Sequence, residues 1–334
     1  MRITLEALHK AARESAERYA RRDRSLVCIY LTGSLLGEEP LLGGTTDIDL
    51  IFVHSTLPPY PREIVRLTDE IHLDIAHLPQ SVFQQPRRLR ADNWIGSFLC
   101  ANPIVLHDIG HWFEFTQASA GAQFDLPEYV LQRARLFSDQ ARQSWLDLQS
   151  QPAQATPQQI HQYLDILENA SNAVSVLYGT PLTERRFLIQ FSQRAQAAGR
   201  PGMAGGLADL IQDDPASLEL IETLLENWRL ALQSAANREE KSPRLDPARL
   251  PYYERAVLAL GEDSPAAALW LLLRTWTRAA RAQPDDAAVL SGWQNACGRL
   301  GLSSAALPER LKAVDAYLDT VEETLDLWGK QYGV

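Results

Sequence analysis

The chain is poor in cysteine, lacks long apolar runs and has no excess of positive charge. Its three cysteines, Cys28, Cys100 and Cys297, are odd in number and far apart in the sequence. This pattern argues against a disulfide framework and against a cysteine zinc site. We therefore expect them to be reduced core residues of a cytoplasmic protein.

No stretch of the sequence approaches the ~20 apolar residues that cross a lipid bilayer. The N-terminal segment, residues 1–22, is charged throughout and lacks the apolar centre of a secretory signal peptide. Its residues Leu5, Leu8, Ala12 and Ala16 recur roughly along one face of a helix. The sequence thus predicts an amphipathic N-terminal helix and no membrane partner.

The charge balance is acidic, with 32 Lys and Arg against 42 Asp and Glu and a net charge of -10. DNA and RNA are polyanions that select basic protein surfaces. The balance therefore argues against a long nucleic acid as partner, although a local basic groove would escape this test.

Alternating structure is predicted in the first part of the chain. Four short runs rich in β-formers, residues 25–31, 47–54, 71–78 and 103–108, are typical of strands. Residues 63–70 are predicted to form a short helix, and residues 79–101 one or two helices.

From about residue 125 the sequence becomes rich in Ala, Leu, Gln, Glu and Arg, which favour helices. Apolar residues recur at three- and four-residue spacing, and we expect a bundle of about seven helices. The tryptophans Trp228, Trp270, Trp276 and Trp293 are predicted core residues. The predicted class is α+β, with a mixed sheet of four to five strands flanked by helices in residues 1–124 and an all-helical domain in residues 125–334.

Three aspartates carry the most informative pattern. Asp47 and Asp49 lie two residues apart on a predicted strand, so their side chains project from the same face. Asp74 lies on the next predicted strand, and because its neighbours Leu73 and Ile75 would face the core, Asp74 can share the open face with the other two aspartates. Like charges gathered on one face repel each other, and a divalent cation removes that conflict. Magnesium prefers such carboxylate oxygens together with phosphate oxygens, and two metals are a further option.

Gly33 and Ser34 follow the first predicted strand. Glycine permits close approach of the backbone to a ligand, and amides with a hydroxyl at a helix start suit phosphate. Asp47 follows Ser34 by thirteen residues, across the turn-rich stretch GEEPLLGGTT.

This ordered set resembles the DNA-polymerase-β-like nucleotidyltransferase superfamily, over residues 25–110. It is most similar to small bacterial enzymes of the aminoglycoside nucleotidyltransferase type, which also carry a helical C-terminal domain. The resemblance implies that Gly33 and Ser34 bind the triphosphate, that Asp47 and Asp49 ligate Mg²⁺ or alternatively Mn²⁺, and that Asp74 completes the site and helps to activate the acceptor hydroxyl. Two departures are a longer spacer containing Gly43-Gly44 and the lack of a basic residue within 35–46.

Further candidates have alternative explanations. Arg87 and Arg88 could clamp the triphosphate or belong to a solvated helix face. His72 falls on the side of Asp74 by strand alternation and is a minor candidate ligand. Glu168 and Asn172, four residues apart on a helix, could touch the base, ribose or acceptor, or form a buried polar network.

The function expected from these features is transfer of a nucleoside monophosphate to a hydroxyl, with release of pyrophosphate. The donor is ATP or another nucleoside triphosphate, and the acceptor is a small molecule or a protein. Two alternatives stay open: a non-catalytic regulator on the same fold that binds a nucleotide or a protein, and a toxin-type nucleotidyltransferase. The acceptor and the oligomeric state have no signature in the sequence.

Overall fold

A computed structural model describes residues 3–238 and 242–334 of the chain. The chain divides into two compact units, Met1–Tyr129 and Val130–Val334, which are described separately. The sequence-based boundary, between residues 124 and 125, lies five residues earlier. The predicted α+β class is confirmed, because the first unit holds a mixed five-stranded sheet and the C-terminal region is helical.

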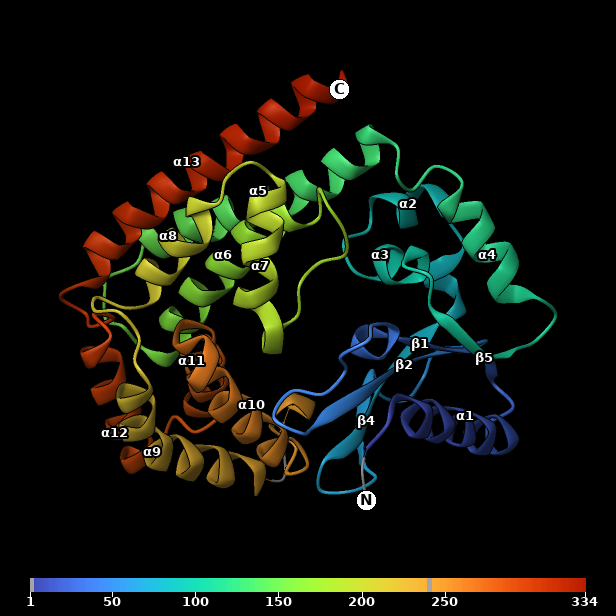
Figure 1. Cartoon of the computed structure of the whole chain (residues 1–334), viewed down its shortest axis with the longest axis horizontal. Coiled ribbons are helices and arrows are strands. Elements are labelled where there is room, and N and C mark those ends of the chain that lie inside the picture. Colours follow the sequence, from blue (N-terminus) through green and yellow to red (C-terminus); the bar gives the residue numbers. More distant parts are fainter. Residues whose placement is uncertain (1–2, 239–241) are drawn as a thin grey trace. The chain divides into compact units, whose positions relative to one another are not determined.

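The first unit contains all five strands of the described residues (Figure 1). The sheet order is β3-β4-β2-β1-β5; β2 and β4 run parallel, and the other neighbours are antiparallel. In chain order the elements are α1 (Leu5–Arg22), β1 (Leu26–Thr32), the 3₁₀ helix η1 (Gly33–Leu36), β2 (Thr46–His54), β3 (Arg62–Arg66), β4 (Ile71–Pro79), η2 (Gln80–Phe83), α2 (Pro86–Ala91), α3 (Ile95–Cys100), β5 (Ile104–Asp108) and α4 (Trp112–Gly121).

The segment 63–70 was wrongly predicted as a helix, because it contains the edge strand β3. Ile64 and Val65 are β-branched and favour extended backbone, and β3 pairs with β4 from Arg62↔Ala76 to Arg66↔His72. The hydroxyl of Thr68 accepts the backbone N–H of Glu70 and Ile71 in the turn that follows. The hydrogen bonds between β3 and β4 therefore determine the extended conformation of this segment. They outweigh the local spacing of its apolar residues, which suits a helix.

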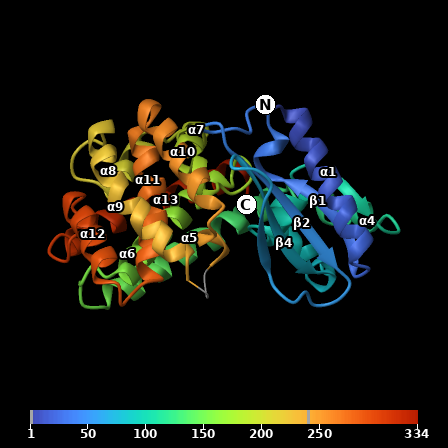
Figure 2. The same cartoon turned by 90° about the horizontal axis from the view of Figure 1, so that it is seen from below.

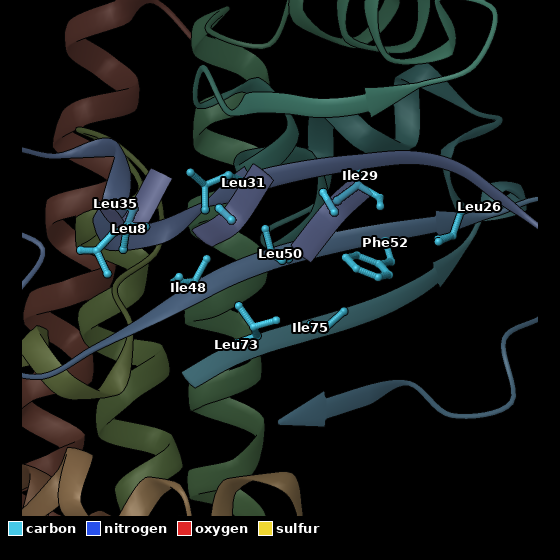
Figure 3. Packing of buried hydrophobic residues seen from close by; sticks show 12 residues of the cluster. Leu8, Leu26, Ile29, Leu31, Leu35, Ile48, Leu50, Phe52, Leu73 and Ile75 are labelled. Carbon is cyan, nitrogen blue, oxygen red and sulfur yellow. The ribbon is translucent and has the colours of Figure 1, made fainter. Parts of the chain in front are cut away.

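Helix α1 packs on one face of the sheet. Ile48, Leu50 and Phe52 of β2 point toward it together with side chains of β1 and β4 (Figure 3). Leu8, Ala12 and Ala16 of the helix are buried in this cluster, as predicted, whereas Leu5 is exposed. The opposite face meets α2, α3 and α4 through a second cluster, which includes Cys28, Tyr30, Val53, Leu89 and Leu99.

The second unit is built from helices (Figure 2). They are α5 (Pro127–Gln149), which begins at the end of the first unit, α6 (Pro157–Ser175), the 3₁₀ helix η3 (Glu184–Arg186), α7 (Phe187–Ala197), α8 (Gly202–Ile211), α9 (Leu218–Ala236), η4 (Pro243–Leu245), α10 (Arg249–Asp263), α11 (Pro265–Arg281), α12 (Ala287–Arg299) and α13 (Leu307–Tyr332). The described residues thus form nine α-helices from α5 onward, more than the seven predicted. Short helices such as α8 are separated by turns, here at Gly199 with φ 69°, that periodicity alone does not count.

Helix α11 forms the centre of the second unit, since nearly all its residues from Ala267 to Ala280 are buried. The indole nitrogens of Trp228 and Trp293 donate to the hydroxyls of Thr275 and Thr277, at 2.9 and 3.0 Å. These bonds satisfy polar groups that would otherwise be costly to bury. The four tryptophans predicted for the core are all buried, which confirms that prediction.

Two of the three cysteines are core residues, as the sequence predicted. None of the three cysteines is in a disulfide; Cys28 and Cys297 are buried and Cys100 is half-buried. No helix formed by the described residues is both long and apolar enough to serve as a membrane span.

Candidate metal centre

Three aspartates meet on the sheet face that turns away from α1. Asp49 of β2 lies beside Asp74 of β4, and Asp47 lies beside His72, in the parallel register of these strands. Each aspartate can offer a carboxylate oxygen such that all three oxygens lie within 4.8 Å of one another. Among the described residues, no other group of three or more His, Cys, Asp or Glu side chains converges in this way. His72 shares their face and is buried, as alternation predicts, but is not part of this convergent set.

The burial of these carboxylates sets the electrostatic problem of the site. Asp74 is 2% exposed and Asp47 9%, while Asp49 is half-buried. Ionised carboxylates are costly to remove from water and repel each other at this separation. Their hard oxygen donors are those that Mg²⁺ prefers, so the residue set fits a divalent cation.

Arg62 belongs to this site and was missed in the sequence. Its Nε and one terminal nitrogen donate to the two oxygens of Asp74, at 2.5 and 2.7 Å. The sequence predicted a helix over residues 63–70, next to Arg62. It therefore gave no reason to expect the Arg62 side chain on the sheet face of the aspartates. The β-branched pair Ile64-Val65 was the signal that could have placed it. Three carboxylates and one guanidinium carry a formal charge of -2, which one divalent cation balances.

Gly33 stands directly against the centre. Its backbone φ is 76°, and a Cβ atom at this position would lie 2.0 Å from Oδ2 of Asp49. Only glycine allows both the left-handed backbone and this approach. The neighbouring Ser34 hydroxyl lies 3.5 Å from the hydroxyl of Thr46. These residues begin the single 3₁₀ turn of η1 instead of a longer helix.

The long spacer before Asp47 ends in a tight turn. Leu42 and Thr45 exchange backbone hydrogen bonds of 3.0 and 3.2 Å across Gly43 and Gly44. Both glycines have positive φ, 58° and 73°, which a type I′ turn requires. The Gly43-Gly44 pair therefore closes the loop just before β2.

The remaining candidates of the first unit lie apart from these contacts. Arg87 and Arg88 are exposed on α2. Their neighbour Arg90 donates to the carbonyls of Ser119 and Ala120, which links α2 to the end of α4. Two exposed guanidinium groups fit both a solvated helix face and a phosphate contact.

Glu168 and Asn172 are engaged inside the helical unit. Glu168 pairs with Arg274 of α11, and burial raises the pKa of its carboxyl. Asn172 is fully buried; its Oδ1 accepts the N–H of Leu182 at 2.7 Å and its Nδ2 donates to the carbonyl of the same residue at 3.4 Å. The structure thus gives both residues partners that hold α6 to neighbouring segments.

Glu184 of η3 completes an ionic cluster next to Glu168. Its carboxylate accepts from Arg278 at 2.6 Å and is 8% exposed. Burial alone would raise the pKa of Glu184, but the charges of Arg278 and Arg244 lower it to about 2. Two neighbouring carboxyls are therefore shifted in opposite directions, Glu168 upward and Glu184 downward.

Comparison of the sequence with protein-family models finds no matching family, and comparison with curated proteins finds no match either.

Proposed function

We propose that the chain is a metal-dependent nucleotidyltransferase that moves a nucleoside monophosphate, AMP from ATP in the first instance, onto a hydroxyl group. The observation that supports this most is the convergence of Asp47, Asp49 and Asp74 within 4.8 Å on one sheet face. Such a set suits phosphoryl chemistry, in which catalysis is mainly positioning and charge stabilisation.

Each residue of the centre would have a separate role in this reaction. Asp47 and Asp49 would hold the cation, since they lie on one strand and their oxygens converge. Arg62 orients Asp74 through both of its oxygens, leaving lone pairs that can accept the hydrogen bond of an acceptor hydroxyl. When bound, Mg²⁺ supplies positive charge that offsets the developing charge on the phosphate oxygens.

The Gly33-Ser34 turn would receive the phosphates. The absent side chain at Gly33 lets the Asp49 carboxylate lie directly against the backbone of this turn. Ser34 is partly exposed, and its hydroxyl adds a hydrogen-bond donor to this turn. The proposed phosphate donors would thus lie next to the proposed metal ligands, since Thr32, just before Gly33, pairs with Asp49.

The test is transfer of label from α-labelled ATP to candidate acceptors, or to the protein itself, with Mg²⁺ present. The variant Asp49→Asn keeps the side-chain shape but removes one negative charge, and we expect it to lose at least 100-fold in rate, roughly the effect of removing one group that stabilises the transition state. The matched control is Asp69→Asn, which alters an exposed aspartate paired with Arg66 and should leave the rate unchanged.

Full transfer by folded Asp49→Asn would overturn the proposal. Binding of ATP that does not require Mg²⁺, with no pyrophosphate release, would instead favour the regulator that binds nucleotide without reaction.

A further inference from the structure

A second polar cluster lies on the α1 side of the sheet and has no role in the proposed reaction. Ser25 donates to Oδ1 of Asp23 at 2.7 Å, and its oxygen lies 2.9 Å from Nδ1 of His54. Nε2 of His54 lies 2.9 Å from Nδ1 of His77. Nε2 of His77 then faces Oε1 of Glu63 at 3.4 Å. Five side chains thus form one continuous row from the end of α1 across β2 and β4 to β3, which we call the histidine row.

The histidine row lacks one hydrogen. It has four links, Asp23 to Ser25, Ser25 to His54, His54 to His77 and His77 to Glu63, and each needs one hydrogen. The serine hydroxyl and two neutral imidazoles supply three, and ionised carboxylates supply none. The unfilled link is the longest one, because Nε2 of His77 and Oε1 of Glu63 are both buried atoms with no hydrogen-bond partner. There, two acceptors face each other.

The surroundings of the row favour this protonation pattern. His54 is 3% exposed and His77 6%, and burial together with its neighbour His77 lowers the pKa of His54. Donation from His77, once its Nε2 carries a proton, lowers the pKa of Glu63, and the hydrogen bond from Tyr19 also lowers it, so the carboxylate stays ionised when the link is filled. Hydrogen bonding to Ser25 lowers the pKa of Asp23 against the opposing effect of burial.

The other titratable groups around the row are tyrosines and one arginine. The edge of Tyr60 packs on the His77 ring with centroids 5.0 Å apart, and Tyr19 of α1 faces Glu63, with Arg18 nearby. Burial and Glu63 raise the pKa of Tyr19 to about 12, so it remains a neutral donor. The Glu63 side chain keeps 24% of its surface exposed, which gives protons from solvent a route to the unfilled link.

We propose that the histidine row is a proton-binding site: on mild acidification it takes up one proton from solvent between His77 Nε2 and Glu63 Oε1. The new N–H bond makes His77 an imidazolium that donates to the Glu63 carboxylate, and all four links are then filled. A second proton is excluded because it would place two N–H groups against each other across the 2.9 Å gap between the rings.

The first test is the pH dependence of folding stability for the wild type and Glu63→Gln. A glutamine amide donates a permanent hydrogen to His77 Nε2 while its oxygen still accepts from Tyr19, so the variant needs no proton. The unfolded chain binds two protons on these histidines near their ordinary pKa of about 6.5. The folded wild type binds one and the folded variant none. As the pH falls from about 8 to 5.5, the variant's unfolding constant should therefore rise relative to that of the wild type, by up to about tenfold per pH unit.

Urea unfolding followed by circular dichroism measures this ratio, and His111→Gln, an exposed histidine on the same unit, is the matched control. The control should follow the wild-type slope. Equal slopes for the wild type and Glu63→Gln would overturn the proposal.

The second test uses the wild type alone and decides the matter if the variant does not fold. In ¹⁵N-histidine NMR of the full chain, one step should protonate His77 Nε2 while His54 keeps a single proton. Two independent steps, or a His77 Nε2 that carries its hydrogen in the neutral ring at all pH values, would also overturn it.

Discussion

At the candidate metal centre, close packing restricts which residue a position can hold. Gly33 is the clearest case, because a side chain there would overlap the carboxylate of Asp49. Its positive φ adds a second requirement for glycine. Gly44 has a similar φ of 73° but no atom within 4 Å of a Cβ position. Gly33 is therefore required both for its backbone conformation and for its lack of a side chain, whereas Gly44 is required for its backbone conformation alone.

We predict that Gly33→Ala lowers both stability and metal affinity, whereas Gly44→Ala lowers stability only. A non-glycine residue in the left-handed region costs about 1–2 kcal/mol at either position. Only the alanine at position 33 must also displace Asp49. Urea unfolding and Mn²⁺ binding by electron paramagnetic resonance measure the two effects. Equal Mn²⁺ affinities in the two variants would show that Gly33 does not shape the site.

The sequence anticipates part of the centre at this scale. Alternation along residues 47–54 and 71–78 is sufficient to put Asp47, Asp49 and Asp74 on one face. It does not give the parallel register that places Asp49 beside Asp74. Nor does it show that Arg62 binds Asp74, or that the side-chain amide of Asn172 hydrogen-bonds with the backbone of Leu182. Such pairings depend on strand order and on loop paths, which short-range patterns do not encode.

Among the elements, the edge strand β3 connects the two polar clusters of the first unit. Its successive residues Arg62 and Glu63 point to opposite faces, as strand geometry requires. Arg62 binds Asp74 on the face of the aspartates, and Glu63 faces His77 on the face of α1. The four other strands were predicted from their β-rich runs, while β3 was taken for a helix because its sequence, REIVR, has only two β-branched residues among three charged ones.

We predict that Arg62→Gln destabilises the protein without metal and that Mg²⁺ restores more stability to the variant than to the wild type. The substitution removes the two charge-assisted hydrogen bonds that Arg62 donates to the buried Asp74 carboxylate, at a cost of about 2 kcal/mol given the partial exposure of Arg62. The local charge then changes from -2 to -3, which strengthens cation binding. Urea unfolding with and without Mg²⁺ measures both the loss of stability in the variant and the stability that Mg²⁺ restores.

Arg66→Gln on the same strand is the control, since Arg66 pairs with the exposed Asp69 and should show no Mg²⁺ effect. If Mg²⁺ stabilises neither the wild type nor Arg62→Gln, no cation binds at the three aspartates.

In the whole molecule, the two units are stabilised by ionisable groups that act in different pH ranges. The lowered pKa of His54 makes the first unit lose stability as the pH falls through the ordinary histidine value of about 6.5, because the unfolded chain then binds more protons. In the second unit, Glu184 has a lowered pKa of about 2. Its contribution is complete above the ordinary glutamate value of about 4.3 and is lost as the pH falls toward 2.

We predict that Glu184→Gln lowers the free energy of unfolding by about 3 kcal/mol at neutral pH, because the pKa shift of Glu184 is lost and Arg278 stays buried without its carboxylate. The difference from the wild type should shrink below about pH 4, where the wild-type carboxyl also loses charge in the unfolded chain. Urea unfolding followed by tryptophan fluorescence measures it. Glu309→Gln, in an exposed pair with Lys312, should have little effect, and a similar loss in both variants would contradict the assignment.

The unequal burial of the three cysteines has a practical consequence for spectroscopy. Burial raises the pKa of the thiols of Cys28 and Cys297, which keeps them protonated and slow to react with maleimides. Cys100, half-buried at the end of α3, is then the preferred attachment point for a nitroxide or a fluorophore in the native protein. A single reporter installed there, in the same unit as Asp47, Asp49 and Asp74, would let Mn²⁺ occupancy be followed by paramagnetic broadening without mutating a single residue.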